Sequence, residues 1–97
     1  MPTLHIVRQS AFNTNDFFQC SQVIKDSDTL VFTDDGCYNF QHQLMNSIKV
    51  KQNIKVNILS HHAKARGLSI DTSELAGITM HELVSLTFDN DRVITWQ

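Results

Sequence analysis

The sequence predicts an α/β domain in which a mainly parallel five-stranded sheet is flanked by helices. Five short apolar or β-branched segments alternate with four stretches of helical periodicity, which is the pattern of parallel strands joined by helical crossovers. The segment Leu30-Val31-Phe32 carries no polar residue, as expected for a strand covered on both faces. A length of 97 residues fits a single domain spanning positions 1–97.

The expected strands are short and end at polar or glycine-containing turns. They span residues 4–7, 29–33, 54–59, 75–78 and 92–96. Since a helical stretch separates each strand from the next, consecutive strands run in the same direction. Their carboxyl ends therefore lie along one edge of the sheet, where ligands and partners of such folds bind.

Apolar residues that recur on one face predict the first two helices. These are residues 16–25, with Phe17, Cys20 and Ile24 on the apolar face, and residues 38–50, with Phe40, Leu44 and Ile48 on it. A third, short helix is expected over residues 61–66, because Gly67 is suited to the left-handed conformation that ends a helix.

The last helix is predicted by a capping box, in which Thr79 is the N-cap and Glu82 is the third helical residue. The residues expected on its shared face are Met80, Leu83, Val84 and Thr87. Four helices, one of them barely two turns long, give thin cover for five strands. Because a parallel sheet needs cover on both faces and protection at its edges, the sequence indicates an oligomer.

Charge and apolar pattern argue against several classes of protein. The formal net charge is −2, whereas a free-standing nucleic-acid binder usually carries a basic patch. The apolar runs, of which residues 29–32 are among the longest, are too short to span a bilayer. Met1-Pro2-Thr3 leads into the first strand without the charged and apolar regions of a signal peptide, so a cytoplasmic location is expected.

The two cysteines, Cys20 and Cys37, fit neither a zinc motif nor a CxxC redox pair, because 16 residues separate them. Cys37 follows Gly36 at an expected helix start, where backbone amides would favour a thiolate or persulfide. It also heads the apolar face of residues 38–50, and a small buried side chain is the preferred interpretation. Cys20 lies on the apolar face of its helix and is interpreted as a core residue. No catalytic residue is therefore assigned, and Cys37 and Cys20 are the weak candidates.

Asp34 and Asp35 follow the second strand as a carboxylate pair, an arrangement that can hold Mg²⁺ in phosphoryl chemistry. A receiver-type site would need a further Asp at the end of the next strand, which instead reads Ile58-Leu59-Ser60. Turn formation explains the pair better, because Asp accepts local backbone N–H groups and Gly36 supplies a positive φ. The sequence therefore predicts no metal site here.

The histidines divide into two groups. His61 and His62 follow the third strand, but adjacent residues of a helix do not share a face, so joint metal binding is not expected. They are interpreted as solvated loop histidines. His5 lies inside the first strand and is expected to be a hydrogen-bonded imidazole in the core or in an interface.

Four blocks occur in an order and at spacings typical of one family. They are Leu4-His5-Ile6-Val7-Arg8-Gln9-Ser10, Phe32-Thr33-Asp34-Asp35-Gly36, Ala65-Arg66-Gly67-Leu68 and Trp96. In this combination the whole chain resembles the DsrH/TusB family of sulfur-relay proteins. The resemblance implies a three-layer, flavodoxin-like (DsrE/F-like) domain that assembles with TusC- and TusD-like sister subunits into a hetero-oligomer.

The same resemblance implies a function. Complexes of the TusBCD type pass persulfide sulfur between proteins toward 2-thiolation of the wobble uridine of certain tRNAs. The sulfur-bearing cysteine lies on a sister subunit, so this chain is expected to be a structural partner that is not itself an enzyme. It would need no cofactor and no metal, and would meet sulfur-carrier proteins transiently through the complex, with no direct contact to nucleic acid or membrane.

Three alternatives stay open. The first is a sulfurtransferase that carries persulfide on Cys37 or Cys20, since some DsrH-type proteins have a cysteine in their first helix. The second is a DsrEFH-type subunit of dissimilatory sulfur oxidation, which uses the same fold. The third is a flavodoxin-like binder of a phosphate ligand. It is the weakest alternative, because the chain has no glycine-rich loop to hold a phosphate.

Three residues are candidates for an interface. Trp96, on the last strand, either seals the core or docks a partner, and interfaces are enriched in Trp. Arg66 either complements the negative end of its helix dipole or reaches a neighbouring subunit. His5 is the third candidate, as a buried imidazole that could face a partner.

Overall fold

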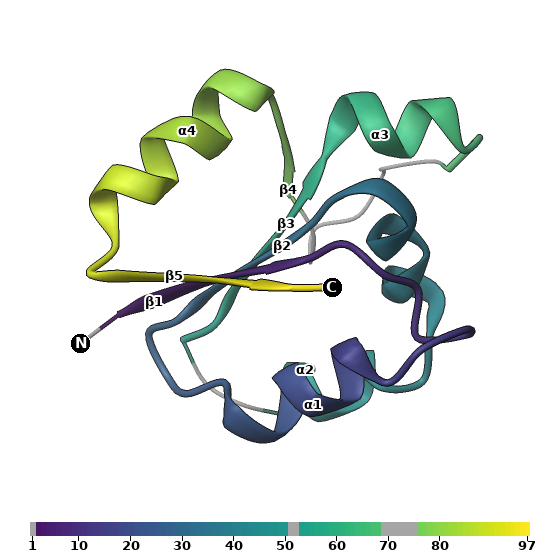
Figure 1. The fold of residues 1–97 in the computed structure, drawn as a ribbon, viewed down its shortest axis with the longest axis horizontal. Helices are drawn as coiled ribbons and strands as arrows, with labels where there is room; N and C mark the ends of the chain where they lie inside the picture. Colours follow the sequence, from purple (N-terminus) through teal and green to yellow (C-terminus); the bar gives the residue numbers. More distant parts are fainter. Residues whose placement is uncertain (1, 51–52, 69–75) are drawn as a thin grey trace.

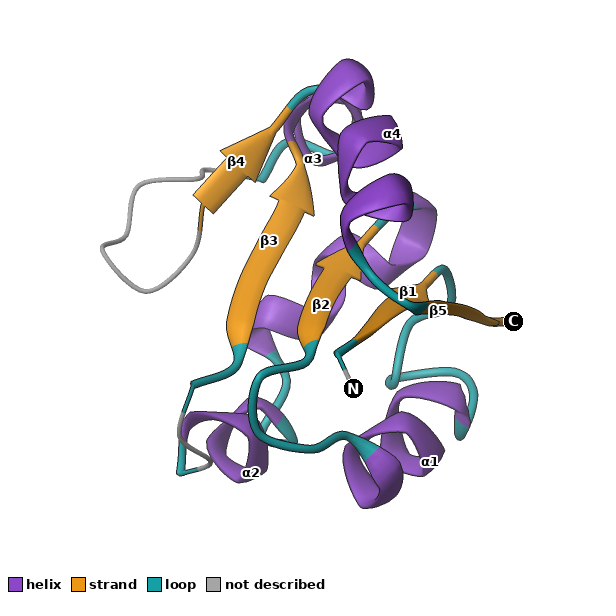
Figure 2. Cartoon of the chain, turned by 90° about the vertical axis from the view of Figure 1, so that its left-hand side faces the viewer, coloured by secondary structure: helices purple, strands orange, loops and turns teal. Residues whose placement is uncertain are grey.

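The computed structural model describes residues 2–50, 53–68 and 76–97, and its five strands form one sheet in which every pairing is parallel (Figure 1). The strands are β1 Thr3–Val7, β2 Thr29–Phe32, β3 Lys55–Leu59, β4 Ala76–Ile78 and β5 Arg92–Trp96. Their order across the sheet is β4-β3-β2-β1-β5, as the face-on view in Figure 2 shows for β4 to β1. The predicted fold class is confirmed. Residue 75, where the fourth strand was expected to begin, lies outside the described residues.

Helices cover both faces of the sheet (Figure 1). Their bounds are α1 Asp16–Val23, α2 Met45–Lys49, α3 Ser60–Ala65 and α4 Met80–Asp89, with a 3₁₀ helix η1 over Asp34–Gln41. α1 and α2 lie on one face and α4 lies on the other. α3 follows the end of β3, and its Ala63 packs in the core cluster that also contains Phe17 and Ile48. Among the residues described, no helix is long and apolar enough to cross a membrane.

The prediction of one continuous helix over residues 38–50 is wrong. The chain forms η1, leaves helical geometry at His42 (φ −85°, ψ 146°) and re-enters it in α2. The ring Nδ1 of His42 accepts the backbone N–H of Leu44, a local side-chain bond that competes with helix continuation. The apolar positions were nevertheless predicted correctly, because Phe40, Leu44 and Ile48 pack with the core on the α1 side.

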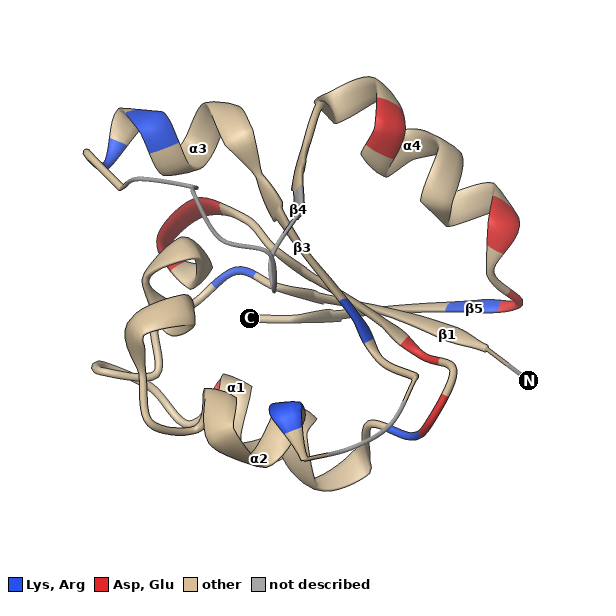
Figure 3. Cartoon of the chain, turned by 180° about the vertical axis from the view of Figure 1, so that it is seen from behind, with Lys and Arg blue, Asp and Glu red and all other residues tan. Residues whose placement is uncertain are grey.

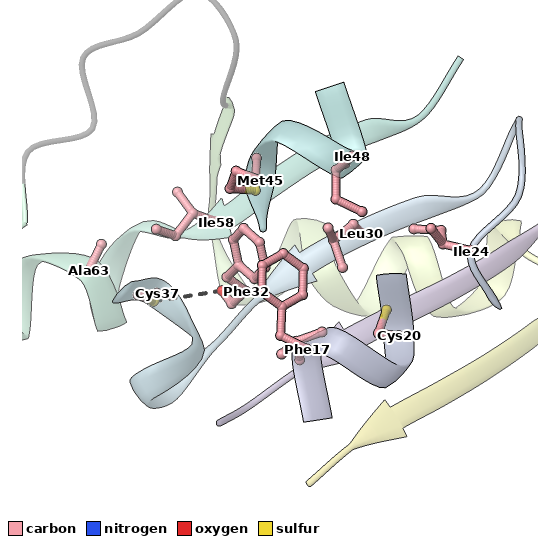
Figure 4. Packing of buried hydrophobic residues seen from close by; sticks show 11 residues of the cluster. Phe17, Cys20, Ile24, Leu30, Phe32, Cys37, Met45, Ile48, Ile58 and Ala63 are labelled. Atoms are coloured by element: carbon pink, nitrogen blue, oxygen red, sulfur yellow. Dashed lines mark hydrogen bonds between the residues drawn. The ribbon is translucent and has the colours of Figure 1, made fainter. Parts of the chain in front are cut away.

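The larger part of the core lies between the sheet and the helices α1 and α2 (Figure 4). Its centre is an edge-to-face contact between the rings of Phe17 and Phe32, whose centroids are 5.3 Å apart. A smaller cluster lies on the α4 side and contains Leu4, Val31, Leu59, Ile78 and Leu83. Because every residue of β2 is buried, the expectation of a strand covered on both faces is confirmed.

The start of α4 is confirmed, but its expected face is only partly correct. Thr79 Oγ1 accepts the N–H of Glu82 at 3.1 Å, and Glu82 Oε1 accepts the N–H of Thr79 at 3.0 Å, which completes the capping box. Leu83 is buried, as predicted, whereas Met80 and Val84 are exposed. Leu86, which the prediction left out, packs against the α4-side cluster instead.

Candidate functional site at the carboxyl edge of the sheet

Charged side chains from three separate segments meet at the carboxyl ends of β1 and β2. We call this group the carboxyl-edge cluster; it consists of Arg8, Asp34, Asp35, His62 and Arg66. In Figure 3 the acidic start of η1 lies between the basic end of α3 and the end of β1. Three of the four sequence blocks described above contribute a residue to this edge.

The turn after β2 sets the geometry of the cluster. Gly36 donates its N–H to the carbonyl oxygens of Thr33, at 2.8 Å, and Arg8, at 3.0 Å. A Cβ at position 36 would lie 2.1 Å from the carbonyl oxygen of Val7, so only glycine fits there. Asp34 adopts a left-handed φ of +49°, which Asp tolerates better than most residues. The tight turn is as predicted, but the expectation that Gly36 supplies its positive φ is wrong: Asp34 is the left-handed residue, and Gly36 is required because the backbone of Val7 approaches it closely.

One half of the cluster is centred on Asp34. Arg8 Nε donates to Asp34 Oδ2 at 3.0 Å, and Arg8 Nη1 donates to Gln97 Oε1 at 2.5 Å. The backbone N–H of Asp34 donates to His62 Nδ1 at 2.8 Å. His62 Nδ1 therefore carries no proton in this arrangement. The expectation of a merely solvated histidine is wrong for His62, which is partly buried, while His61 is exposed.

The other half joins α3 to η1. Arg66 Nε donates to Asp35 Oδ1 at 2.9 Å, and Arg66 Nη1 donates to the carbonyl oxygen of His62 at 3.2 Å. The hydrogen bond to Asp35 is the main cause that raises the pKa of Arg66. Both carboxylates of the pair are thus paired with arginine. Within the described part of the chain, no group of three or more His, Cys, Asp or Glu side chains is arranged to hold a metal ion.

Cys37 is fully buried in the core, as Figure 4 shows, yet it lies near enough to the cluster for the charges of Arg66 and Asp34 to act on its thiol. Its thiol donates to the carbonyl oxygen of Phe32, with 3.7 Å between sulfur and oxygen. Burial raises the pKa of Cys37 to about 11, although the positive charge of Arg66 opposes the shift. Cys37 is therefore a protonated thiol at neutral pH. The backbone amides at the start of η1 do not overcome the effect of burial.

Cys20 is also fully buried, on α1 in the α1-side core with Phe17 and Ile24, and neither cysteine is in a disulfide. The two cysteines are the only ones in the chain. The carboxyl-edge cluster can therefore bind charged groups, but no accessible thiol lies in it.

A second polar arrangement, inside the molecule, joins two of the predicted interface candidates. Trp96 Nε1 donates to His5 Nδ1 at 3.1 Å, and the two rings stack with centroids 6.2 Å apart. His5 Nε2 lies 3.0 Å from Asp28 Oδ2, and both of these side chains are buried. Trp96 is partly buried and packs against the α1-side core. These contacts favour core sealing over docking for Trp96, and the core over an interface for His5.

Sequence reasoning missed Asp28, which directly precedes β2. Its Oδ1 accepts the N–H of Thr3, and its Oδ2 accepts the N–H of Lys25, each at 3.0 Å. Burial opposes ionisation of Asp28, but these two backbone bonds and the bond to His5 outweigh it and lower its pKa. The available signal was the position of an Asp directly before a strand that pairs with the first one.

Asn39 is the other polar residue that sequence reasoning missed. It is fully buried, and its side chain accepts the N–H of Ala11 at 2.6 Å and donates to the carbonyl oxygen of Gln9 at 3.0 Å. These two bonds hold the loop after β1 against η1. Nothing in the local pattern of residues 38–41 indicates this contact.

The comparison with known families decides the assignment. The model of the family described as DsrH like protein matches residues 9–93. The chain belongs to the DsrH-like family. The resemblance to DsrH/TusB proteins is thereby confirmed at the level of the family, which is consistent with a sulfur-relay subunit. The matched range of this DsrH-like chain includes most of the carboxyl-edge cluster but leaves out His5 and Trp96.

Solved structures support the fold of this DsrH-like chain. The YchN protein of E. coli superposes with a TM-score of 0.74 at 21% identity, covering 99% of this chain and all of the other. Protein Tm0979 of Thermotoga maritima gives a TM-score of 0.65 at 19% identity, covering 89% of this chain and 92% of the other. At this level of identity the likeness concerns the fold alone. No curated protein sequence matches the chain significantly.

Proposed function

We propose that this DsrH-like chain is a non-catalytic subunit of a cytoplasmic, TusBCD-like complex that passes persulfide sulfur for 2-thiolation of the tRNA wobble uridine. Family membership supports the sulfur relay. The observation that carries the non-catalytic role is the burial of both thiols of the chain, Cys20 and Cys37.

Persulfide transfer requires a thiolate that attacks the outer sulfur of a donor persulfide. The attacking sulfur must be ionised and must be approached closely by a second protein. Cys37 is protonated at neutral pH and has no exposed surface, and Cys20 is likewise enclosed. A carrier cysteine on a sister subunit satisfies both requirements better.

The partners in this proposal are TusC- and TusD-like sister subunits, with sulfur-carrier proteins that bind the assembled complex transiently. The net charge of −2 gives no reason to invoke direct binding of tRNA by this chain. The paired side chains of the carboxyl-edge cluster would order the loops that face these proteins. No metal or cofactor takes part.

One observation favours a second candidate, a sulfurtransferase that acts through Cys37. This thiol lies at the carboxyl edge, and the charge of Arg66 acts to lower its pKa. That role would require η1 to open so that the sulfur becomes accessible. A DsrEFH-type role in sulfur oxidation uses the same chemistry and differs in the pathway that receives the sulfur.

The test uses the complex co-expressed with its sister subunits. Cys20→Ser, Cys37→Ser and the double variant should transfer persulfide sulfur within a few-fold of the wild type, and should sustain wobble thiolation in cells that lack the native gene. Loss of transfer in folded Cys37→Ser, together with a mass gain of one sulfur atom on the wild-type chain, would establish the second candidate. A deletion strain with normal thiouridine content but impaired sulfur oxidation would move the protein to the other pathway.

A further inference from the structure

The 3₁₀ helix η1 has at each end a histidine ring that accepts a backbone N–H. At its first residue, the N–H of Asp34 donates to His62 Nδ1 at 2.8 Å. Just beyond its last residue, the N–H of Leu44 donates to His42 Nδ1 at 3.0 Å. We call these two hydrogen bonds the η1 latches. Because a backbone N–H can only donate, each latch exists only while its Nδ1 carries no proton.

The start of η1 depends on its latch, because nothing on η1 itself replaces it. Thr33, the N-cap residue, makes no side-chain capping bond, and Asp34 has a left-handed φ of +49°. Eight residues is also a long run for a 3₁₀ helix, whose internal hydrogen bonds have poorer geometry than those of an α-helix. The N–H of Asp34 is therefore satisfied from outside, by a side chain of α3.

η1 carries a buried thiol at its centre. Cys37 is fully buried, and its thiol donates to the carbonyl oxygen of Phe32. α3 packs against η1, and Ala63 of α3 belongs to the same core cluster as Cys37 (Figure 4). A movement that separates η1 from α3 would therefore open a path from solvent to this sulfur.

Protonation of His62 forces a choice of partner. The hydrogen added to Nδ1 would face the N–H of Asp34, donor against donor. Asp34 Oδ1 lies 3.6 Å from Nδ1 and can accept that hydrogen, and Asp35 adds a second negative charge on η1. Arg8 and Arg66, which bind these two carboxylates, oppose a positive charge on the ring. The imidazolium can reach the carboxylate only by giving up the backbone amide, since one nitrogen cannot serve both.

His42 has no replacement of this kind. Among the described residues no carboxylate lies within ion-pair distance of its ring. The loop after β1, which reaches His42 through an edge contact with the ring of Phe12, contains no carboxylate over residues 8–15. The other titratable side chains of η1 and α3, apart from Cys37, supply no carboxylate either; they are Tyr38, His61 and Lys64. Protonation of His42 therefore leaves the N–H of Leu44 without its acceptor.

We propose that His62 and His42 make η1 a pH-sensitive cover over Cys37, which is closed while both imidazoles are neutral and loosened when they are protonated. Histidine is the side chain that ordinarily changes its charge between about pH 5 and pH 8. The closed form binds the neutral rings, so a fall in pH favours the open form. This device goes beyond the proposed function and does not depend on it.

Hydrogen exchange measured by NMR reports on the latches directly. In the wild type, the protection factors of the Asp34 and Leu44 amides should fall at least about tenfold between pH 7.5 and pH 5, because each amide loses its acceptor. His62→Asn is the matched variant, since its side-chain oxygen can take the place of Nδ1 but gains no proton. Its Asp34 protection should not change with pH. In His62→Ala this protection should already be low at pH 7.5.

The reactivity of the thiols reports on the cover. The rate at which a pyridyl disulfide modifies Cys37 in the native chain is divided by the rate in the urea-unfolded chain at the same pH. This ratio should rise at least about tenfold from pH 7.5 to pH 5 in the wild type, and should stay level in the double variant His62→Asn, His42→Asn. Cys20 is the internal control, because it is equally buried but lies on α1. Mass spectrometry of separate peptides should show no change in its ratio.

Each outcome decides the proposal. If the protection of Asp34 or the reactivity of Cys37 does not change between the two pH values, the cover does not respond to pH and the proposal is wrong. Equal opening of the wild type and the double variant in acid would mean that other groups sense the pH. An equal rise at Cys20 would indicate general unfolding, which also overturns the proposal.

A measurement on the wild type keeps the test valid if the Asn variants do not fold. The ring resonances of His62 and His42 give the titration midpoint of each imidazole. The loss of Asp34 protection should follow the midpoint of His62, and the loss of Leu44 protection that of His42. If either loss followed the titration of another group instead, that histidine would not control its end of η1, and the proposal would be overturned.

Discussion

The indole Nε1–H of Trp96 donates a hydrogen bond to Nδ1 of His5, with 3.1 Å between the two nitrogens, and this bond determines which nitrogen of the imidazole ring carries the hydrogen. An indole nitrogen can only donate, so Nδ1 must be the acceptor and Nε2 carries the hydrogen. That hydrogen is directed at Asp28 Oδ2, 3.0 Å from Nε2. The three side chains form a line of hydrogen bonds that joins β5, β1 and the turn before β2.

Removing Trp96 tests whether it seals the core. Trp96→Ala should lower the unfolding free energy of the isolated chain by about 3 kcal/mol, because it empties a packed site and leaves His5 Nδ1 without its donor. Trp96→Phe, which keeps most of the ring volume, should cost about 1 kcal/mol. Urea denaturation of both variants gives the comparison.

Val93→Ala is the control for these variants, since Val93 lies on the same strand and is exposed. It should be nearly neutral in stability. If Trp96→Ala left the stability unchanged but weakened binding to the sister subunits, Trp96 would be an interface residue, and the assignment of its ring to the core would be wrong.

Substitution of Asp28 should be destabilising in a pH-dependent way. In Asp28→Asn, the side-chain NH2 group replaces an oxygen that accepts a backbone N–H, and it cannot accept that hydrogen bond. The free energy of unfolding should therefore fall by about 1–3 kcal/mol at pH 7. The pKa of Asp28 is lowered below its ordinary value of 3.8 in the folded chain. Its ionised form therefore stabilises the fold above pH 3.8, and this contribution is lost as the pH falls through the lowered pKa.

Urea midpoints of wild type and Asp28→Asn, measured from pH 7 down to pH 2, check this sign. The difference between the two proteins should shrink below about pH 4, the ordinary range of an Asp side chain. If the difference between the two urea midpoints grew toward low pH, the ionised carboxylate of Asp28 would be destabilising the fold, contrary to this prediction.

The thiol of Cys37 should be inert in the native protein. Its pKa of about 11 leaves almost no thiolate at pH 7.5, and its burial prevents contact with a reagent. Iodoacetamide followed by mass spectrometry should therefore modify Cys37 only after unfolding in urea. Rapid, stoichiometric modification of the native chain would show that η1 opens readily, and would revive the sulfurtransferase candidate.

Gly36, in the turn after β2, can be compared with Gly67, which follows α3 and serves as the control. Gly36→Ala places a Cβ 2.1 Å from the carbonyl oxygen of Val7, and should cost about 2–3 kcal/mol or more, because backbone has to move. Gly67 has φ +69° with open space around it, so Gly67→Ala should cost only about 1 kcal/mol. Thermal unfolding of the two variants measures the contrast. Equal losses would mean that the turn can shift to admit a side chain.

The strands and their alternation with helices could be predicted because they depend on local pattern. Apolar runs and a capping box are read over a few residues, and the five strands lie within one or two residues of their expected positions wherever the structure describes them. The carboxyl-edge cluster was predictable in outline for a related reason. In a parallel sheet the residues that follow each strand meet at one edge, whatever their distance along the chain.

What could not be predicted depends on partners far along the chain. Asp28 acquires its role from Thr3 and His5, and Asn39 from Gln9 and Ala11, through contacts that exist only once the strands are in register. The exposure of Met80 has the same origin. The spacing of apolar residues shows that a helix has an apolar face, but the sheet determines which face it covers.

The parallel pairing of β1 with β5 has a consequence for how this chain folds during synthesis. β1 lies between β2 and β5, and its second pairing needs residues 92–96, which the ribosome delivers only after β2, β3 and β4. Until then one side of β1 presents unpaired backbone groups in a nascent chain, a state open to aggregation. Contacts of such high sequence separation also form slowly. The stretch of translation between the emergence of β2 and that of β5 is therefore the interval in which this protein most needs protection by chaperones.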